Sequence, residues 1–201
     1  MRMRDAPWRR LGLAEPPAVD GGRQVARELD TMDRAVYQAI GSVSTPRLDK
    51  AMVRLSNAAD KSRLWLGCAT IMAALGGGPG RRAALLGVVS VAFSSAVSNL
   101  VVKPLWARRR PERPATVIPM DRWVRMPTSQ SMPSGHSASA FAFATAVGYA
   151  VPALSAPLHA AATAVAYSRV HTGVHYPADA IVGSVIGTSA AAVVCHILDR
   201  S

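Results

Sequence analysis

Cysteine and aromatic residues are scarce in this 201-residue chain, although half of it is apolar. The two cysteines, Cys68 and Cys195, lie inside apolar segments, so we expect buried, inert thiols rather than a disulfide or a metal site. The first 60 residues are polar throughout, so we expect no secretory signal peptide. Alanine, valine and glycine are abundant instead, and small residues on apolar segments favour close helix packing in lipid.

Acidic residues are also few, since 12 Asp and Glu stand against 23 Lys and Arg, a formal charge of +11. Such an excess points to nucleic acid, anionic lipid headgroups or a phosphorylated substrate. The basic residues alternate with long apolar stretches instead of covering a soluble fold, so we expect no nucleic-acid partner. Between positions 103 and 179 the only acids are Glu112, Asp121 and Asp179, too few for a binuclear metal site. We therefore expect neither a metal ion nor another cofactor.

The N-terminal part divides in two. Residues 1–24 are rich in Pro, Gly and Arg and are predicted to be a mobile tail. Residues 25–61 hold two segments, 25–41 and 46–59, with apolar residues at helical spacing and charge on the opposite face. Neither is apolar enough to span a bilayer, so we predict amphipathic interfacial helices.

Five apolar segments follow, and they predict an all-α fold, a polytopic membrane helical bundle. They cover about 64–79, 83–102, 137–154, 158–167 and 180–198. The second runs for twenty residues without a charge, which favours membrane spans over the buried helices of a soluble protein.

Three short stretches combine the groups needed for displacement at phosphorus: three cations, a hydroxyl, a glycine amide, two imidazoles and a carboxylate. They read Lys103-x6-Arg110-Pro111, Pro133-Ser134-Gly135-His136 and Ser168-Arg169-x5-His175-x3-Asp179. Each lies at the end of an apolar segment. A chain that crosses the membrane back and forth would therefore bring all three to the same face.

These stretches resemble the tripartite signature of the type 2 phosphatidic acid phosphatase (PAP2) superfamily, with every signature position filled. That superfamily includes membrane lipid phosphatases, soluble acid phosphatases and vanadium haloperoxidases. The resemblance implies a PAP2-like transmembrane phosphatase domain over residues 62–201.

Three cations are expected to hold the phosphate oxygens: Lys103, Arg110 and Arg169. Lys103 and Arg110 are seven residues apart and would share one face of a helix, although the proline between them leaves this open. The neighbouring Arg108 and Arg109 are interpreted as contacts to lipid headgroups.

Ser134 and Gly135 come just before a predicted helix start. The serine hydroxyl and the glycine amide can donate to phosphate oxygens at the positive end of that helix. A plain N-cap role for Ser134 is compatible with this. Ser134 could also act as a nucleophile in principle, but no acid lies nearby in the sequence to complete a serine triad.

His175 is the expected nucleophile, because Asp179, four residues later, can accept a hydrogen bond from its far ring nitrogen and fix the tautomer. His136 is expected to give a proton to the leaving alkoxide and later to activate water. The resemblance implies the same roles. His171 competes on sequence alone, but it lacks a carboxylate at i+4 and is interpreted as a secondary polar contact.

We therefore expect a metal-independent membrane enzyme that removes phosphate from a phospholipid or a polyprenyl (di)phosphate through a phosphohistidine. We expect membrane lipid to surround the protein, and its oligomeric state stays open. Two alternatives remain: a vanadate-dependent, haloperoxidase-like enzyme, and a non-catalytic lipid-phosphate binding or transport protein. The complete His136, His175 and Asp179 set argues against the second, because a binder needs only the cations.

The charge distribution bears on orientation in a multi-pass cell-membrane protein. With five spans, the eleven Lys and Arg of residues 1–61, seven more between 103 and 125, and Arg169 share one side. The other side has Arg81, Arg82 and Arg200. The positive-inside rule therefore favours a cytoplasmic site, although many members of the superfamily face the opposite side.

Overall fold

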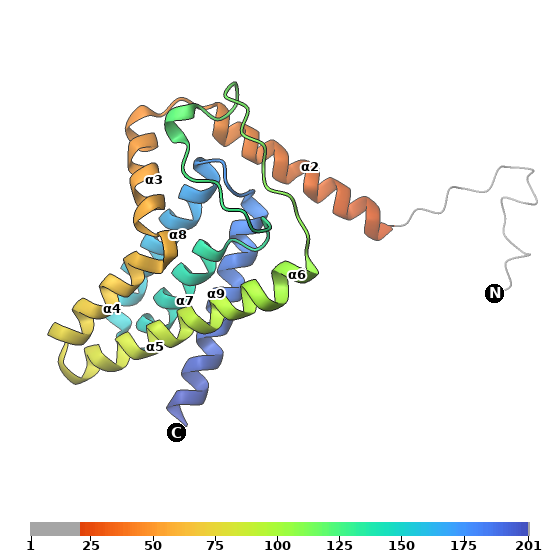
Figure 1. Cartoon of the computed structure of the whole chain (residues 1–201). Helices are drawn as coiled ribbons and strands as arrows, with labels where there is room; N and C mark the ends of the chain where they lie inside the picture. Colours follow the sequence, from red (N-terminus) through yellow and green to blue (C-terminus); the bar gives the residue numbers. More distant parts are fainter. Residues whose placement is uncertain (1–20, 201) are drawn as a thin grey trace, which may run out of the picture. The chain divides into compact units, whose positions relative to one another are not determined.

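The computed structural model describes residues 21–200, and all regular structure in that range is helical (Figure 1). Residues 21–32 form one unit and residues 33–200 a second, compact one. The α-helices are α2 (Gly21–Ser42), α3 (Pro46–Ala58), α4 (Arg63–Leu75), α5 (Gly77–Ala96), α6 (Lys103–Leu105), α7 (Gly135–Ala150), α8 (Ser155–His171) and α9 (Pro177–Asp199). The all-α fold class is confirmed.

Several helix boundaries differ from the sequence expectation; for example, α8 runs over Ser155–His171 where 158–167 was expected. Residues 21–24 belong to α2 and not to a tail, while the rest of the predicted tail lies outside the described residues. The first apolar helix ends at Leu75 instead of position 79, because the chain turns at Gly76 and Gly77. The positive φ of Gly77, 60°, is a conformation that glycine adopts without steric cost.

Helix α7 is the centre of the compact unit, between α5, α8 and α9 (Figure 1). Small residues such as Ala140 and Ala144 are fully buried along it. Phe143 packs against Trp65 of α4 with the ring centroids 5.4 Å apart. A helix that is apolar on every side, as α7 is, needs neighbours on every side, and this explains its central place.

Two glycines of α9 allow this helix to approach α7 at backbone distance. A Cβ atom at Gly183 would lie 2.4 Å from the Ser134 carbonyl oxygen, and one at Gly187 would lie 2.2 Å from that of Ala138. Small residues four apart are a common device for close helix contact in membranes. The contact aligns the N-terminal ends of α7 and α9, which carry two of the three signature stretches.

Among the described residues, two helical segments are long and apolar enough to cross a membrane, Gly77–Leu105 and Pro177–Asp199. Helices α4, α7 and α8 have 13, 16 and 17 residues, fewer than the ~20 that a perpendicular span needs. The number of five spans therefore stays a prediction.

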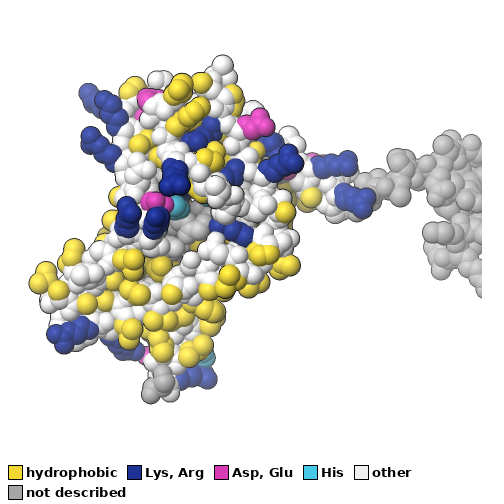
Figure 2. All heavy atoms as spheres, in the orientation of Figure 1, with side chains coloured by type: hydrophobic (Ala, Val, Ile, Leu, Met, Phe, Trp, Pro, Cys, Tyr) yellow, Lys and Arg dark blue, Asp and Glu magenta, His cyan; other side chains and the backbone are white. Residues whose placement is uncertain are grey.

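The surface of the helices carries large apolar side chains. Leu75 is 83% exposed, Leu85 60% and Ile181 63%. On the face drawn in Figure 2, hydrophobic side chains cover most of the α4 and α5 region, and Lys and Arg side chains gather beyond it. An apolar surface of this extent suits contact with lipid.

The α7–α9 contact can be tested with Gly187→Ala. The added methyl group meets backbone atoms of α7, so we expect a loss of stability of about 1–3 kcal/mol, as in other overpacked cores. Gly67→Ala is the matched control, because a Cβ there has nothing within 4 Å and alanine favours helix. Thermal unfolding in detergent measures both, and equal melting temperatures for the two variants would contradict the contact.

Candidate functional site

The structure brings the three signature stretches together at one end of the bundle. The Ser134 amide donates to the Asp179 carbonyl oxygen at 2.9 Å, which joins the second stretch to the third. Arg110 joins the first to the third, because its Nη1 donates to the Val174 carbonyl oxygen at 2.9 Å. The predicted convergence of the stretches is thus present in the fold.

Lys103 and Arg110 meet by a route other than the one expected. The helix ends at Leu105, so the two residues do not share a helical face. They meet at Ser129, whose hydroxyl oxygen lies 3.2 Å from Lys103 Nζ and 3.3 Å from Arg110 Nη2. Burial lowers the pKa of Arg110 to about 10, with the charge of Asp179 opposing it, so the guanidinium stays cationic at neutral pH.

Ser134 is the N-cap of α7. Its buried hydroxyl accepts from the Ser137 amide at 3.4 Å and from the Ser137 hydroxyl at 3.0 Å. A Cβ added at Gly135 would have nothing within 4 Å, so the first turn of α7 borders open space there. An anion next to this turn would face free backbone amides and the positive end of the helix.

His175 lies in the turn between α8 and α9, between a cation and a carboxylate. Its Nε2 is 3.1 Å from Arg110 Nη1, and its Nδ1 is 3.4 Å from Asp179 Oδ2. A guanidinium only donates, so Nε2 is the acceptor and the ring proton is on Nδ1, facing Asp179. Burial lowers the pKa of His175 to about 4, which the hydrogen bond to Asp179 opposes and the charges of Arg110 and Arg169 reinforce. The imidazole is therefore neutral at pH 7, with its lone pair on Nε2.

The Asp179 carboxylate is fixed from several sides in the first turn of α9. Oδ2 accepts from the Tyr176 amide at 2.9 Å and from the Ser131 hydroxyl. Oδ1 accepts from Arg108 at 3.1 Å. Such partners hold the carboxylate in the orientation that the His175 tautomer requires.

Arg108 corrects the sequence interpretation, which placed it at lipid headgroups. Its Nη1 lies 2.7 Å from Asp33 Oδ2 and 3.1 Å from Asp179 Oδ1, and its side chain is only 14% exposed. Its guanidinium also lies 4.2 Å from the centre of the Tyr176 ring. Asp33 in turn accepts from the Ala178 amide at 2.8 Å. Arg108 thus helps to hold the Asp179 carboxylate in place.

Helix α3 and the turn after it supply partners that the sequence did not reveal. Arg169, 3% exposed, donates to the Ser56 hydroxyl, and its Nε has no partner among the described residues. His136 Nε2 lies 3.6 Å from Asp60 Oδ1, beyond hydrogen-bond distance. The end of α3 and the turn after it therefore border the candidate site.

His171 has a carboxylate partner, contrary to expectation. Its Nε2 is 2.8 Å from Asp49 Oδ1, and Asp49 also pairs with the buried Arg122 at 2.9 Å. The partner is 122 residues away, so no local spacing could have indicated it. The predicted secondary, polar role of His171 agrees with this position, in which the ring ties α8 to α3.

Within residues 21–200, no three His, Cys, Asp or Glu side chains form a group that could hold a metal ion. Independence of metal stays a prediction. Cys195 is buried and Cys68 partly buried, and both are free thiols.

The sequence model of the PAP2 superfamily matches residues 83–201. The chain belongs to the PAP2 superfamily. Its curated relatives include the decaprenylphosphoryl-5-phosphoribose phosphatase of Mycobacterium tuberculosis, 35% identical over 120 residues, which are 58% of this chain and 62% of that protein. The enzyme of the same name from Mycolicibacterium smegmatis is 33% identical over 109 residues, 52% of this chain and 55% of the relative. The matches thus span about three fifths of these relatives.

Two solved PAP2-type structures share the fold. The transmembrane phosphatidylglycerolphosphate phosphatase of Bacillus subtilis superposes with a TM-score of 0.68 at 22% identity, covering 86% of this chain and 87% of its own. Aquifex aeolicus LpxE gives 0.65 at 20% identity, covering 82% and 95%. At these identities the likenesses show that the fold is shared.

Arg108→Gln tests whether Arg108 positions Asp179. We expect kcat for phosphate release from p-nitrophenyl phosphate to fall about tenfold or more, while KM changes little, because supporting partners of a site typically contribute that much. The double variant with Arg108→Gln and Asp33→Asn should lose no more activity than Arg108→Gln alone, since both residues act through the same carboxylate.

Arg109→Gln is the control, because Arg109 is exposed and one residue away. A similar loss in the control, or a loss confined to KM, would contradict a positioning role for Arg108.

Proposed function

We propose that this PAP2 member is an integral-membrane lipid phosphatase that forms a phosphohistidine at His175. One observation carries the proposal: Nε2 of a neutral His175 lies against Arg110, one of the cations expected to bind phosphate. The proposed nucleophilic lone pair thus lies next to the charge that would bind the phosphate. Asp179 stabilises the imidazolium that forms when the lone pair is used.

The first step transfers the phosphoryl group. A phosphate monoester enters with its oxygens on Arg110, Lys103 and Arg169, and Arg110 moves from Nε2 to the phosphate. The Nε2 lone pair then forms the N–P bond while the P–O bond to the lipid alkoxide breaks. Burial and the charges of Arg169, His175, Arg110 and Lys103 lower the pKa of His136 in the free enzyme, and the bound phosphate offsets those positive charges. His136 therefore takes up a proton as the substrate binds, and as an imidazolium it gives this proton to the alkoxide, which leaves as an alcohol.

The second step returns the enzyme to its starting state. Water attacks phosphorus, and His136 takes a proton from this water. The N–P bond breaks, and inorganic phosphate leaves with the electron pair back on His175 Nε2. Ser134 and Gly135 donate to the phosphate oxygens in both steps from the N-terminus of α7. The cations carry the charge stabilisation that a metal ion would otherwise supply.

A lipid-linked substrate is supported by the relatives and by the fold. The curated relatives are named for a decaprenylphosphoryl pentose phosphate, and the Bacillus subtilis structure for a phosphatidylglycerol phosphate. The signature stretches lie at one end of apolar helices, where a lipid can keep its tail in the bilayer while its phosphate reaches the cations. Phospholipid phosphates and polyprenyl (di)phosphates are the substrate classes that we propose.

Substitutions at His175 and Asp179 test the mechanism. His175→Ala should abolish phosphate release from detergent-solubilised lipid phosphates while substrate binding survives, because the cations remain. Asp179→Asn should lower kcat by about two to four orders of magnitude through the wrong tautomer. The assays contain EDTA, and the wild type should keep its activity there. Quenched-flow trapping should place the phosphoryl label on histidine, whereas label on Ser134 or a need for added magnesium would contradict the mechanism.

The membrane orientation can be proposed from charge. Arg81 and Arg82 lie near the start of α5, and α9 ends next to Arg200, both at the opposite end from the signature stretches. The signature end has the larger number of Lys and Arg residues, even without the three phosphate-binding cations. We therefore propose a multi-pass protein of the cell membrane with the site on the cytoplasmic face.

Reporter fusions test this orientation. With five spans, the C-terminus lies opposite the site, so alkaline phosphatase fused after Ser201 should be active and a reporter that requires the cytoplasm should be silent. A fusion at Gly78, in the first turn of α5, should behave in the same way. The reverse pattern at both positions would place the site outside the cytoplasm.

A further inference from the structure

His136 has a ring nitrogen that is buried and without a partner. Nε2 is shielded from solvent, and no group in residues 21–200 lies within hydrogen-bond distance of it. The proposed mechanism requires His136 as an imidazolium, and in that form both ring nitrogens carry a proton. A buried N–H of a cation that finds no acceptor is costly, because burial removes the water that would otherwise accept from it. The signature residues thus leave one proton of the acid without an acceptor.

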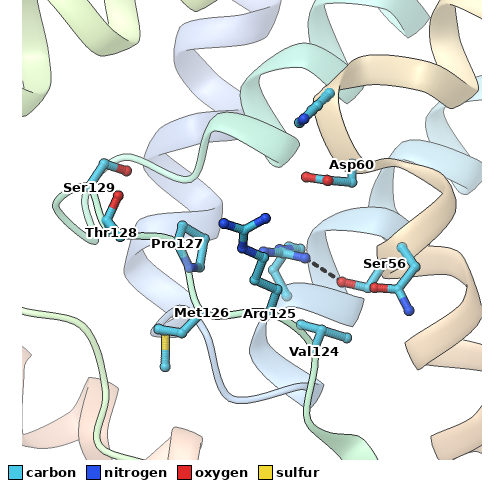
Figure 3. Close-up of a pocket in the computed structure, with 11 residues that line it drawn as sticks. Ser56, Asp60, Val124, Arg125, Met126, Pro127, Thr128 and Ser129 are labelled. Atoms are coloured by element: carbon cyan, nitrogen blue, oxygen red, sulfur yellow. Dashed lines mark hydrogen bonds between the residues drawn. The ribbon is translucent and has the colours of Figure 1, made fainter.

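Asp60 offers a carboxylate next to this nitrogen. Its Oδ1 lies 3.6 Å from His136 Nε2, just beyond hydrogen-bond distance. The Asp60 side chain is 51% exposed and forms no hydrogen bond within the described part of the chain. Figure 3 shows its carboxylate pointing into a polar cavity of about 340 Å³, which Arg169 also lines. An exposed side chain changes rotamer within nanoseconds, so a small rotation of Asp60 can close the gap.

The backbone keeps Asp60 beside the start of α7. Helix α3 ends at Ala58 and α4 begins at Arg63, and the turn between them shares a cavity of about 150 Å³ with the first turn of α7. Directly after Asp60, Lys61 and Ser62 both have positive φ, 51° and 58°. Non-glycine residues with positive φ are uncommon, and they gather at binding and catalytic sites. The sharp turn lets α4 begin while Asp60 stays next to the first turn of α7.

Burial and four neighbouring groups act against protonation of His136 and hold its pKa well below the ordinary value in the free enzyme. The four groups are Arg169, His175, Arg110 and Lys103. Lys61 is a further cation, on the wall of the smaller cavity that His136 lines. A carboxylate within about 4–6 Å favours the charged form of an imidazole and opposes these effects. Asp60 lies in that range, whereas Asp179 is engaged by His175.

We propose that Asp60 positions His136 for proton transfer: when the substrate is bound, the carboxylate accepts a hydrogen bond from Nε2–H and leaves Nδ1 to react. In the first step the Nδ1–H bond breaks, and its proton passes to the alkoxide as the P–O bond breaks. In the second step Nδ1 takes a proton from the attacking water, while Nε2 keeps its own. The arrangement is the reverse of the His175–Asp179 pair, in which the carboxylate holds Nδ1 and Nε2 reacts. The inference rests on the proposed function, and it gives a role to a residue outside the range 83–201 that the family model matches.

Two aryl phosphates of similar shape and charge test this role: phenyl phosphate and p-nitrophenyl phosphate. Phenolate is the poorer leaving group and depends on a proton, whereas p-nitrophenolate leaves with little help. We expect Asp60→Asn to lower kcat/KM for phenyl phosphate by about tenfold or more, and kcat/KM for p-nitrophenyl phosphate by no more than about twofold. Asp60→Glu keeps the carboxylate and should recover most of the lost activity. An equal loss with both substrates, or no loss with either, would overturn the proposal.

Two further variants serve as controls. Asp121→Asn removes the same charge from an exposed side chain that lines neither cavity, so its ratio of the two kcat/KM values should stay within about twofold of the wild type. His136→Ala separates the inference from the proposed function. If this variant loses activity equally with both substrates, His136 is not the proton donor, and the inference falls with that step of the mechanism. If it loses activity selectively with phenyl phosphate and Asp60→Asn does not, only the role of Asp60 is wrong.

The titration of His136 gives a readout that does not require turnover. His175→Ala protein with isotope-labelled histidine is titrated by NMR in the presence of inorganic phosphate, with and without Asp60→Asn. A negative charge favours the imidazolium, so its loss should move the titration midpoint of His136 to lower pH by about one unit or more. Asp121→Asn should leave the midpoint where it is. An unchanged midpoint in the Asp60→Asn variant would overturn the proposal, whether or not the wild type releases phosphate.

Discussion

The backbone contact between α7 and α9 is the constraint on which the site depends. Gly183 and Gly187 have no side chain to keep the helices apart, so carbonyl groups of α7 lie against the surface of α9. The Ser134 amide can then donate to the Asp179 carbonyl oxygen. This contact holds the N-termini of α7 and α9 side by side. The hydroxyl and amides at the start of α7 therefore lie next to the carboxylate at the start of α9. The alignment thus depends on two glycines that lie outside the signature stretches.

The acidic partners of the candidate site come mostly from outside the apolar helices. The apolar helices contain almost no acidic residues, yet the cations and imidazoles of the site need partners. The partners come from the N-terminal helices: Asp33 contacts Arg108, Asp49 contacts His171, and Asp60 lies near His136. Within residues 33–200, the apolar helices thus set the positions of the candidate site residues, and acidic residues from outside those helices balance their charge.

The helices and the convergence of the signature stretches could be predicted because both follow from local pattern. Uncharged runs predict helices. When successive helices run in opposite directions, the end of one and the start of the next lie at the same end of the bundle, and so do the stretches attached to them. Arg108 could not be told apart from Arg109 in a run of three arginines, because only the fold decides which of them faces Asp33 and Asp179. The pairing of His171 with Asp49 joins residues 122 positions apart and leaves no local signal. The proline between Lys103 and Arg110 had left the helix end open, and the irregular segment after Leu105 is held by contacts to Ser129 and Val174 that no local pattern indicates.

The contact of Arg110 with His175 has a consequence for selectivity. While the guanidinium lies on Nε2, the lone pair of the imidazole is engaged, and a neutral electrophile has nothing to offer the cation in exchange. In the proposed mechanism a phosphate draws the guanidinium to its own oxygens and so frees the nitrogen. The negative charge of the substrate would then be what exposes the nucleophile, and selection by charge would precede selection by shape.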